Sequence, residues 1–280
     1  MNQTLSFVLD PVKLDELAEK YREAYAQAAP FPHIVIDDFL PADALRQVLS
    51  EFPGARQIDW NKFNDPAQRK LGSTAESQIG EYTRFLLYQF NSSTFIRFLE
   101  KLTGISGLLP DPHFIGGGIH QILRGGFLKI HADFNRHPLL PLDRRLNLLL
   151  YLNEDWREEY GGHLELWSRD MSECRARILP VFNRCVIFST TDYSFHGHPD
   201  PLKCPQERTR KSMALYYYSN GRPEEESSPE HGTLFQHRPG ESYDLSAVVS
   251  PPQPLTAKQI IIKFVPPIVM EAYLSLKRRV

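Results

Sequence analysis

Little in this 280-residue sequence points to a disulfide framework, a polyanionic partner or a membrane. Its three cysteines, Cys174, Cys185 and Cys204, include no Cys-x-x-Cys pair, so a structural zinc site has little support and reduced thiols fit best. The formal net charge of −2 gives no reason to expect nucleic acid. No run reaches the roughly 18 apolar residues of a membrane span, and no signal-peptide pattern is present. We therefore expect a cytoplasmic protein with no membrane partner, and the sequence carries no signal for its oligomeric state.

The N-terminal part of the chain places hydrophobic residues at helical spacing. Asp10 is a candidate N-cap that precedes Pro11 at the first helical position, and Ser92 is a second candidate N-cap. Caps and periodicity together predict a strand over 31–39 and helices over about 10–28, 41–52, 81–90 and 93–103. Residues 54–79 are polar and interrupted by Gly and Pro, which predicts a lid or an ordered binding loop.

The periodicity changes from helical to strand-like at His113. Short runs rich in β-branched and aromatic residues then follow one another, separated by Gly, Pro, Asn and Asp. Closely spaced strands of this kind predict a sandwich or jelly roll. We expect a mainly β fold with flanking helices, forming one unit with a helical region (1–112), a β core (113–222) and a C-terminal extension (223–280). The extension is rich in Pro, and a closing helix is predicted after Pro266-Pro267.

Three polar side chains of the β core are candidate metal ligands. His131 and Asp133 lie two residues apart on a predicted strand, so their side chains share one face. His-x-Asp is a weak signal by itself, but a second His follows on another predicted strand, as His196 or His198. His196 is favoured because His198 precedes Pro199, where the chain is expected to leave the strand. Two His and one carboxylate on one face of a metal are typical of non-haem Fe(II) oxygenases.

A basic residue opens the last strong strand, KSMALYYY. The period of two places Arg210 on the same face as Ser212, Ala214 and Tyr216. If this face lines the pocket, the planar guanidinium suits a dicarboxylate cosubstrate, because it binds carboxylates in a bidentate manner. Arg208 has the same parity and remains an alternative.

Four segments of the core carry a family resemblance: GGFLKIHAD, RRLNLLLYLNEDWREEYGGHLELW, ILPVFNRCVIFSTTDYSFHGH and RKSMALYYY. In order and spacing they resemble the catalytic core of prolyl-hydroxylase-type Fe(II)- and 2-oxoglutarate-dependent oxygenases, over about residues 113–219. The resemblance implies a double-stranded β-helix (jelly roll) with His131, Asp133 and His196 as the iron ligands. Phe188 stands at the family's spacing of eight residues before His196.

The resemblance also implies residues that bind the cosubstrate. Arg210 matches the basic residue that pairs with the remote carboxylate of 2-oxoglutarate, and Tyr151 matches a tyrosine that hydrogen-bonds the same group. Asn147 lies on the same face of its strand as Tyr151, and Gln121 is a looser candidate. The chain departs from the family between His198 and Arg210, where the connection is longer.

The reaction that the resemblance implies is hydroxylation of an unactivated C–H bond, with Fe(II), 2-oxoglutarate and O2 as cofactors and ascorbate as an activator in vitro. A carboxylate at Asp133 favours hydroxylation, since related halogenases have a small residue there. The first expectation for the substrate, a small molecule or a peptide, is a prolyl residue or a proline-like, amino-acid-derived compound. Two alternatives are a cupin-type metal dioxygenase that needs no 2-oxoglutarate and a non-catalytic jelly-roll binding module. Residues 54–79 and the Pro-rich tail are the expected specificity elements.

Overall fold

The computed structural model describes residues 7–248, which contain four α-helices. The helix α1 begins as the sequence predicts: the side chain of Asp10 accepts hydrogen bonds from the amides of Val12 and Lys13, and Pro11 is the first helical residue. Ser92 caps α4 in the same way. None of the described helices is long and apolar enough to cross a membrane. The helices are α1 (Pro11–Gln27), α2 (Ala42–Glu51), α3 (Glu81–Phe90) and α4 (Ser93–Thr103).

Thirteen strands of the described chain form one sheet. In chain order they are β1 (His33–Ile36), β2 (Asn61–Asp65), β3 (Gln68–Ser73), β4 (Leu109–Pro110), β5 (Gly118–Ile122), β6 (Phe127–Ala132), β7 (Asp143–Tyr151), β8 (Leu164–Trp167), β9 (Cys174–Ile178), β10 (Cys185–Ser189), β11 (His196–His198), β12 (Arg210–Ser219) and β13 (Leu234–Phe235). Short 3-10 helices lie at η1 (Glu76–Gln78), η2 (Glu158–Tyr160), η3 (Glu224–Glu226) and η4 (Leu245–Ala247).

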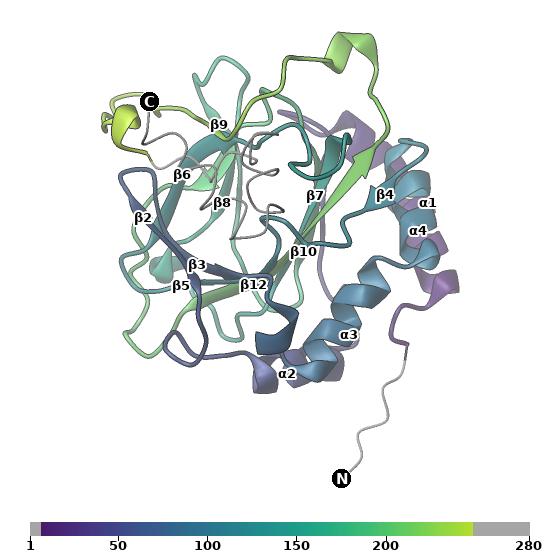
Figure 1. Cartoon of the computed structure of the whole chain (residues 1–280), viewed down its shortest axis with the longest axis horizontal. Helices are drawn as coiled ribbons and strands as arrows, with labels where there is room; N and C mark the ends of the chain where they lie inside the picture. Colours follow the sequence, from purple (N-terminus) through teal and green to yellow (C-terminus); the bar gives the residue numbers. More distant parts are fainter. Residues whose placement is uncertain (1–6, 249–280) are drawn as a thin grey trace, which may run out of the picture. The chain divides into compact units, whose positions relative to one another are not determined.

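The sheet is antiparallel and curls around its own interior (Figure 1). Its strands lie in the order β1-β10-β7-β12-β5-β3-β6-β11-β8-β9, and β2, β4 and β13 pair with β3, β12 and β6. The chain crosses repeatedly between distant strands, which is typical of a jelly roll. The predicted fold class, a mainly β jelly roll with flanking helices, is confirmed.

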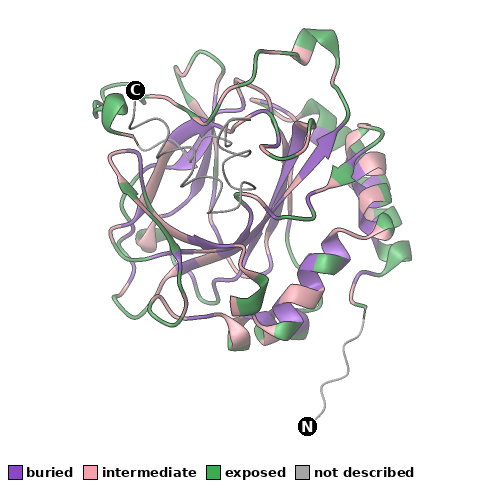
Figure 2. Cartoon of the chain, in the orientation of Figure 1, coloured by how far each residue is buried: buried purple, intermediate pink, exposed green. Residues whose placement is uncertain are grey.

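The two faces of the sheet bury different side chains. On β7, Leu146, Leu148 and Leu150 pack into one apolar cluster with residues of all four helices. The alternate residues of this strand, among them Asn147 and Tyr151, point to the interior of the curl. In Figure 2 the ribbon of β7 is coloured as buried along most of its length, so residues that point to either side of this strand are buried. The apolar contacts of the sheet with the helices are thus made by its outer face. Polar side chains such as Asn147 can therefore occupy the inner face.

The prediction that 54–79 is a loop is wrong for 61–73, because this part forms the hairpin β2–β3, while a role as a lid or in binding stays a prediction. β3 lies inside the sheet and pairs with both β5 and β6. Its sequence, QRKLGS, shows no hydrophobic alternation because a polar interior receives its inward side chains. With β1, the strands β2 and β3 also show that the region before residue 113 contributes to the sheet as well as to the helices. The predicted closing helix lies outside the described residues.

Candidate metal centre and anion pocket

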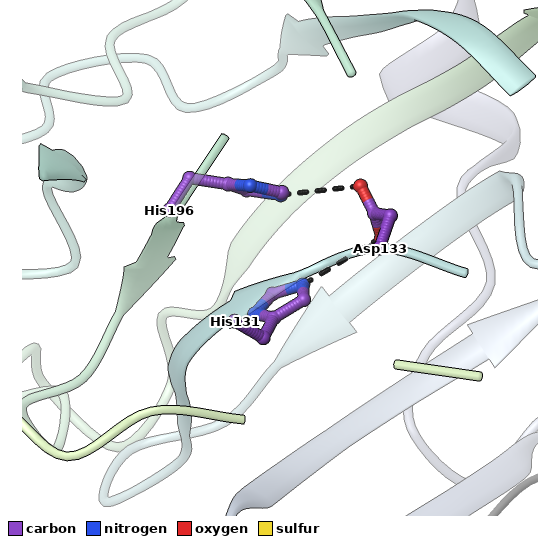
Figure 3. A group of neighbouring side chains, drawn as sticks. All are labelled: His131, Asp133 and His196. Carbon is purple, nitrogen blue, oxygen red and sulfur yellow. Dashed lines mark ion pairs between the residues drawn. The ribbon is translucent and has the colours of Figure 1, made fainter. Parts of the chain in front are cut away.

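The structure brings His131, Asp133 and His196 together at the inner face of the sheet (Figure 3). The Nε2 atom of His131 lies 3.7 Å from Oδ1 of Asp133, and the Nε2 atom of His196 lies 3.5 Å from Oδ2 of the same carboxylate. The imidazole rings are 4.5 Å apart, and one donor atom from each residue lies within 4.8 Å of the others. Both His residues are buried and Asp133 is mostly so. The three donors therefore surround one point.

Strand pairing explains how residues 65 positions apart in the sequence meet. β11 lies antiparallel to β6 with His196 opposite His131, and Asp133 follows directly after β6. Gly197 makes this pairing possible: a Cβ atom there would lie 2.8 Å from the carbonyl oxygens of Leu128 and Lys129. A side chain at that position would push the two strands apart.

The donors have the chemistry that a divalent metal requires. His131 and His196 each donate from Nδ1 to a backbone carbonyl, of Lys129 and Ser194, at 2.8 Å, which leaves Nε2 with its lone pair toward Asp133. Burial, followed by the neighbouring His131, lowers the pKa of His196 to about 4, so its ring is neutral at pH 7. Two imidazole nitrogens and one carboxylate fit Fe(II) and leave coordination positions open.

Asp133 is held as a carboxylate by two buried partners. Burial by itself would raise the pKa of Asp133, but the guanidinium of Arg144 and the two histidines outweigh it and hold the pKa well below its usual range. Asn147 donates to Oδ2 of Asp133 at 2.6 Å, and Nη2 of Arg144 lies 3.2 Å from the same oxygen. The network thus keeps the acid ionised and fixes its orientation.

A second polar site lies on β12 and β7. Nε of Arg210 donates to the carbonyl of Gly162 at 2.9 Å, and Nη2 donates to the hydroxyl of Tyr151 at 3.3 Å. Arg210 is 4% exposed, yet no carboxylate of residues 7–248 forms an ion pair with it. Gly162 makes room for this side chain, because a Cβ there would lie 3.0 Å from Cδ of Arg210. A buried cation without an acid partner is costly, so this pocket fits an anionic ligand.

The other predicted residues lie elsewhere or have other partners. Asn147 contacts Asp133 and Arg144 rather than Arg210. Gln121 bonds to the carbonyl of Pro53 and the hydroxyl of Thr209, so the structure does not bring it to the other candidates. Of the two alternatives, Arg208 bonds to the backbone carbonyls of residues 154 and 155. His198 is buried but is not one of the three grouped donors.

Sequence reasoning missed two residues that matter for the site. The alternation of side chains does not decide whether Arg144 or the adjacent Arg145 faces the interior of the sheet. Arg144 packs between aromatic rings, 3.5 Å from the ring centre of Tyr216 and 4.4 Å from that of Phe134. Lys70 lies in the segment 54–79, for which the sequence predicts a loop, and its place on the inner face follows from the pairing of β3 with β5 and β6. Predicting a strand over 68–73 would have placed Lys70 on the inner face of the sheet.

Comparisons with known proteins cover the same region. Residues 117–218 match the sequence model of a family described as the 2OG-Fe(II) oxygenase superfamily. Prolyl 3-hydroxylase OGFOD1 of Mus musculus is 29% identical over 79 residues, which is 27% of this chain and only 14% of that protein.

Two solved structures share the fold. A prolyl hydroxylase from Trichoplax adhaerens, in complex with a hypoxia inducible factor oxygen degradation domain peptide fragment, has a TM-score of 0.50 and 18% identity and covers 74% of this chain and 91% of its own. A prolyl 4-hydroxylase from Phytophthora capsici also has a TM-score of 0.50 and 18% identity, covering 78% of this chain and 68% of its own. The resemblance inferred from the sequence motifs is therefore confirmed for the β core.

Proposed function

We propose that this chain, whose residues 117–218 match the model of the 2OG-Fe(II) oxygenase superfamily, is a dioxygenase that hydroxylates a C–H bond with Fe(II) and 2-oxoglutarate. The observation that carries the proposal is the combination of a His131, Asp133, His196 cluster with a buried Arg210 that has no acid partner in the described chain. The cluster of three donors would bind the metal, and the buried guanidinium would bind the cosubstrate.

Each group of the site has a distinct task in this reaction. His131, Asp133 and His196 would hold Fe(II), and Asn147 with Arg144 would keep the carboxylate ionised and oriented. Arg210 and the hydroxyl of Tyr151 would bind a carboxylate of 2-oxoglutarate. When bound, iron and cosubstrate supply dioxygen activation, in which 2-oxoglutarate is converted to succinate and carbon dioxide while a substrate C–H bond is hydroxylated.

Two alternatives explain less of the site. A cupin-type dioxygenase without a cosubstrate would need the metal ligands but leaves the unpaired Arg210 without a role. A jelly-roll binding module leaves the convergence of three metal donors unexplained. The 2-oxoglutarate-dependent reaction uses both features.

For the substrate we propose a prolyl residue of a peptide or a proline-like compound. Support comes from the proteins that share sequence or fold, which include a prolyl 3-hydroxylase and a prolyl hydroxylase solved with a peptide. We also propose a reducing compartment such as the cytoplasm, which agrees with three free cysteines, two of them buried.

The direct test measures succinate formed from 2-oxoglutarate by the purified chain with Fe(II), ascorbate and a panel of prolyl peptides, proline and other amino acids. Asp133→Ala and His196→Ala should abolish turnover because each removes a metal donor. Normal turnover by both variants would refute the assignment.

A variant of the anion pocket tests the cosubstrate separately. Arg210→Met should raise the KM for 2-oxoglutarate by about tenfold or more, the magnitude of a lost charge-assisted hydrogen bond, with metal affinity unchanged. Arg208→Met is the matched control, because Arg208 bonds to backbone carbonyls away from Tyr151. If the control raises KM and Arg210→Met does not, the roles of the two arginines are reversed.

A further inference from the structure

The inner face of the sheet carries other basic groups besides Arg210. Gly72 of β3 pairs with His120 of β5, and His120 pairs with Ser212 of β12. Lys70 lies two residues from Gly72, and Arg210 lies two residues from Ser212. The period of two therefore places Lys70, His120 and Arg210 on one face of three adjacent strands.

His198 joins this set from the other side of β3. Leu128 of β6 pairs with Gln68 of β3 and with His198 of β11, so His198 faces the same way as Gln68 and Lys70. It is 4% exposed, and neither ring nitrogen has a hydrogen-bond partner among residues 7–248. The charged and titratable groups that act on its ring are Arg210, Lys70, His131 and His120. Burying two imidazole nitrogens without partners is costly, which indicates that a ligand satisfies at least one of them.

Lys70 also forms no ion pair within the described chain. Its amino group lies 5.0 Å from the ring centre of Phe63, and the carboxylates of Asp133 and Asp65 act on its charge only from a distance. His120, in contrast, already bonds to the carbonyl of Gly117 at 3.0 Å, so its ring is committed to the backbone. Of the four basic side chains on this face, Lys70, His198 and one end of Arg210 therefore have donors without an acceptor among residues 7–248.

We propose that Lys70 and His198 bind 2-oxoglutarate directly. Both donate hydrogen bonds to the dianion that Arg210 and Tyr151 also contact. This inference rests on the proposed function and adds two residues that the family resemblance did not supply. The dianion would neutralise Lys70 and Arg210, neither of which forms an ion pair in the described part of the chain, and it would give the imidazole of His198 an acceptor.

Calorimetric titration of the full-length chain tests this without turnover. Protein loaded with Mn(II), which does not support the oxidation, is titrated with 2-oxoglutarate. Lys70→Met and His198→Leu should each raise the Kd for 2-oxoglutarate by about tenfold or more. Lys70→Arg and His198→Gln, which keep a donor, should stay within about threefold of the wild-type value, while the Kd for Mn(II) alone stays unchanged in all four.

The matched control is Arg69→Met, since Arg69 is the exposed neighbour of Lys70 on the opposite face of β3 and bonds to Asn64. It should leave the Kd for 2-oxoglutarate unchanged. Thermal unfolding of the ligand-free variants gives an independent readout: removing an unpaired cation or imidazole should not lower Tm, whereas removing a structural residue would. Unchanged 2-oxoglutarate binding by Lys70→Met and His198→Leu overturns the inference. Failure of the wild-type protein to bind 2-oxoglutarate would instead overturn the proposed function.

Discussion

The carboxylate of Asp133 is the residue on which the polar contacts of the site converge. Asn147 donates to it, and Arg144 both pairs with it and donates from Nε and Nη2 to the amide oxygen of Asn147. The amide is thereby fixed in the orientation that points its NH2 group at the acid. Arg144 itself is held between two aromatic rings, which fixes its guanidinium beside Asp133 and Asn147.

Removing the amide should therefore weaken metal binding without removing a ligand. Asn147→Ala takes away the 2.6 Å hydrogen bond to Asp133 and leaves the carboxylate free to turn. We expect a loss in Mn(II) affinity of about 10- to 100-fold, the usual effect of deleting a group that orients a metal ligand. Calorimetry measures it, with Asn64→Ala on the exposed hairpin strand β2 as the control. Wild-type affinity in Asn147→Ala would show that Asp133 is oriented by Arg144 alone.

Individual elements differ in how far the sequence predicts them. α1 and α4 could be predicted from Asp10 and Ser92 because cap and helix are local and need no distant partner. β7 could be predicted because its leucines alternate against the helical layer. The hairpin β2–β3 could not, since its place is fixed by pairing with β5 and β6, and its inward residues are polar. The three metal donors could be predicted from the motif and its spacing. Asn147 and Arg144 could not be predicted as partners of Asp133, because only the pairing of the strands brings them to it.

The contact between β11 and β6 is the element-scale feature that the metal centre needs most. Gly197→Ala would place a methyl group 2.8 Å from two backbone oxygens of β6, which cannot move aside as a side chain can. We expect the free energy of unfolding to fall by roughly 1–3 kcal/mol and Mn(II) affinity to fall with it, because His196 moves away from His131. Urea unfolding and calorimetry check the two effects. Gly232→Ala is the control, since a Cβ there meets nothing within 4 Å, and equal behaviour of both variants would contradict the argument.

Across the described chain, the basic groups of the inner face link stability to pH. Burial lowers the pKa of His120 and of His196 from 6.5 to about 4, so these rings stay neutral in the folded protein while the unfolded chain takes up protons. Burial likewise lowers the pKa of Lys70 from 10.5 to about 8. For each of these groups, at a pH between its pKa in the folded protein and its pKa in the unfolded chain, the unfolded chain binds more protons than the folded one. Stability therefore rises with pH across each of these windows.

Metal-free protein should accordingly lose stability as the pH falls from 6.5 to 4 and gain stability as it rises from about 8 toward 10. Each group contributes a slope of at most about 1.4 kcal/mol per pH unit. His120→Gln should make the acidic slope shallower and leave the alkaline one. Lys70→Met should remove the alkaline slope and also make the acidic one somewhat shallower, because the charge of Lys70 helps to lower the pKa of His120. Urea unfolding in the presence of a chelator, repeated from pH 4 to 10, measures both slopes. If each variant keeps both slopes of the wild-type protein, the pKa values of His120 and Lys70 are not lowered in the folded protein, which contradicts the prediction.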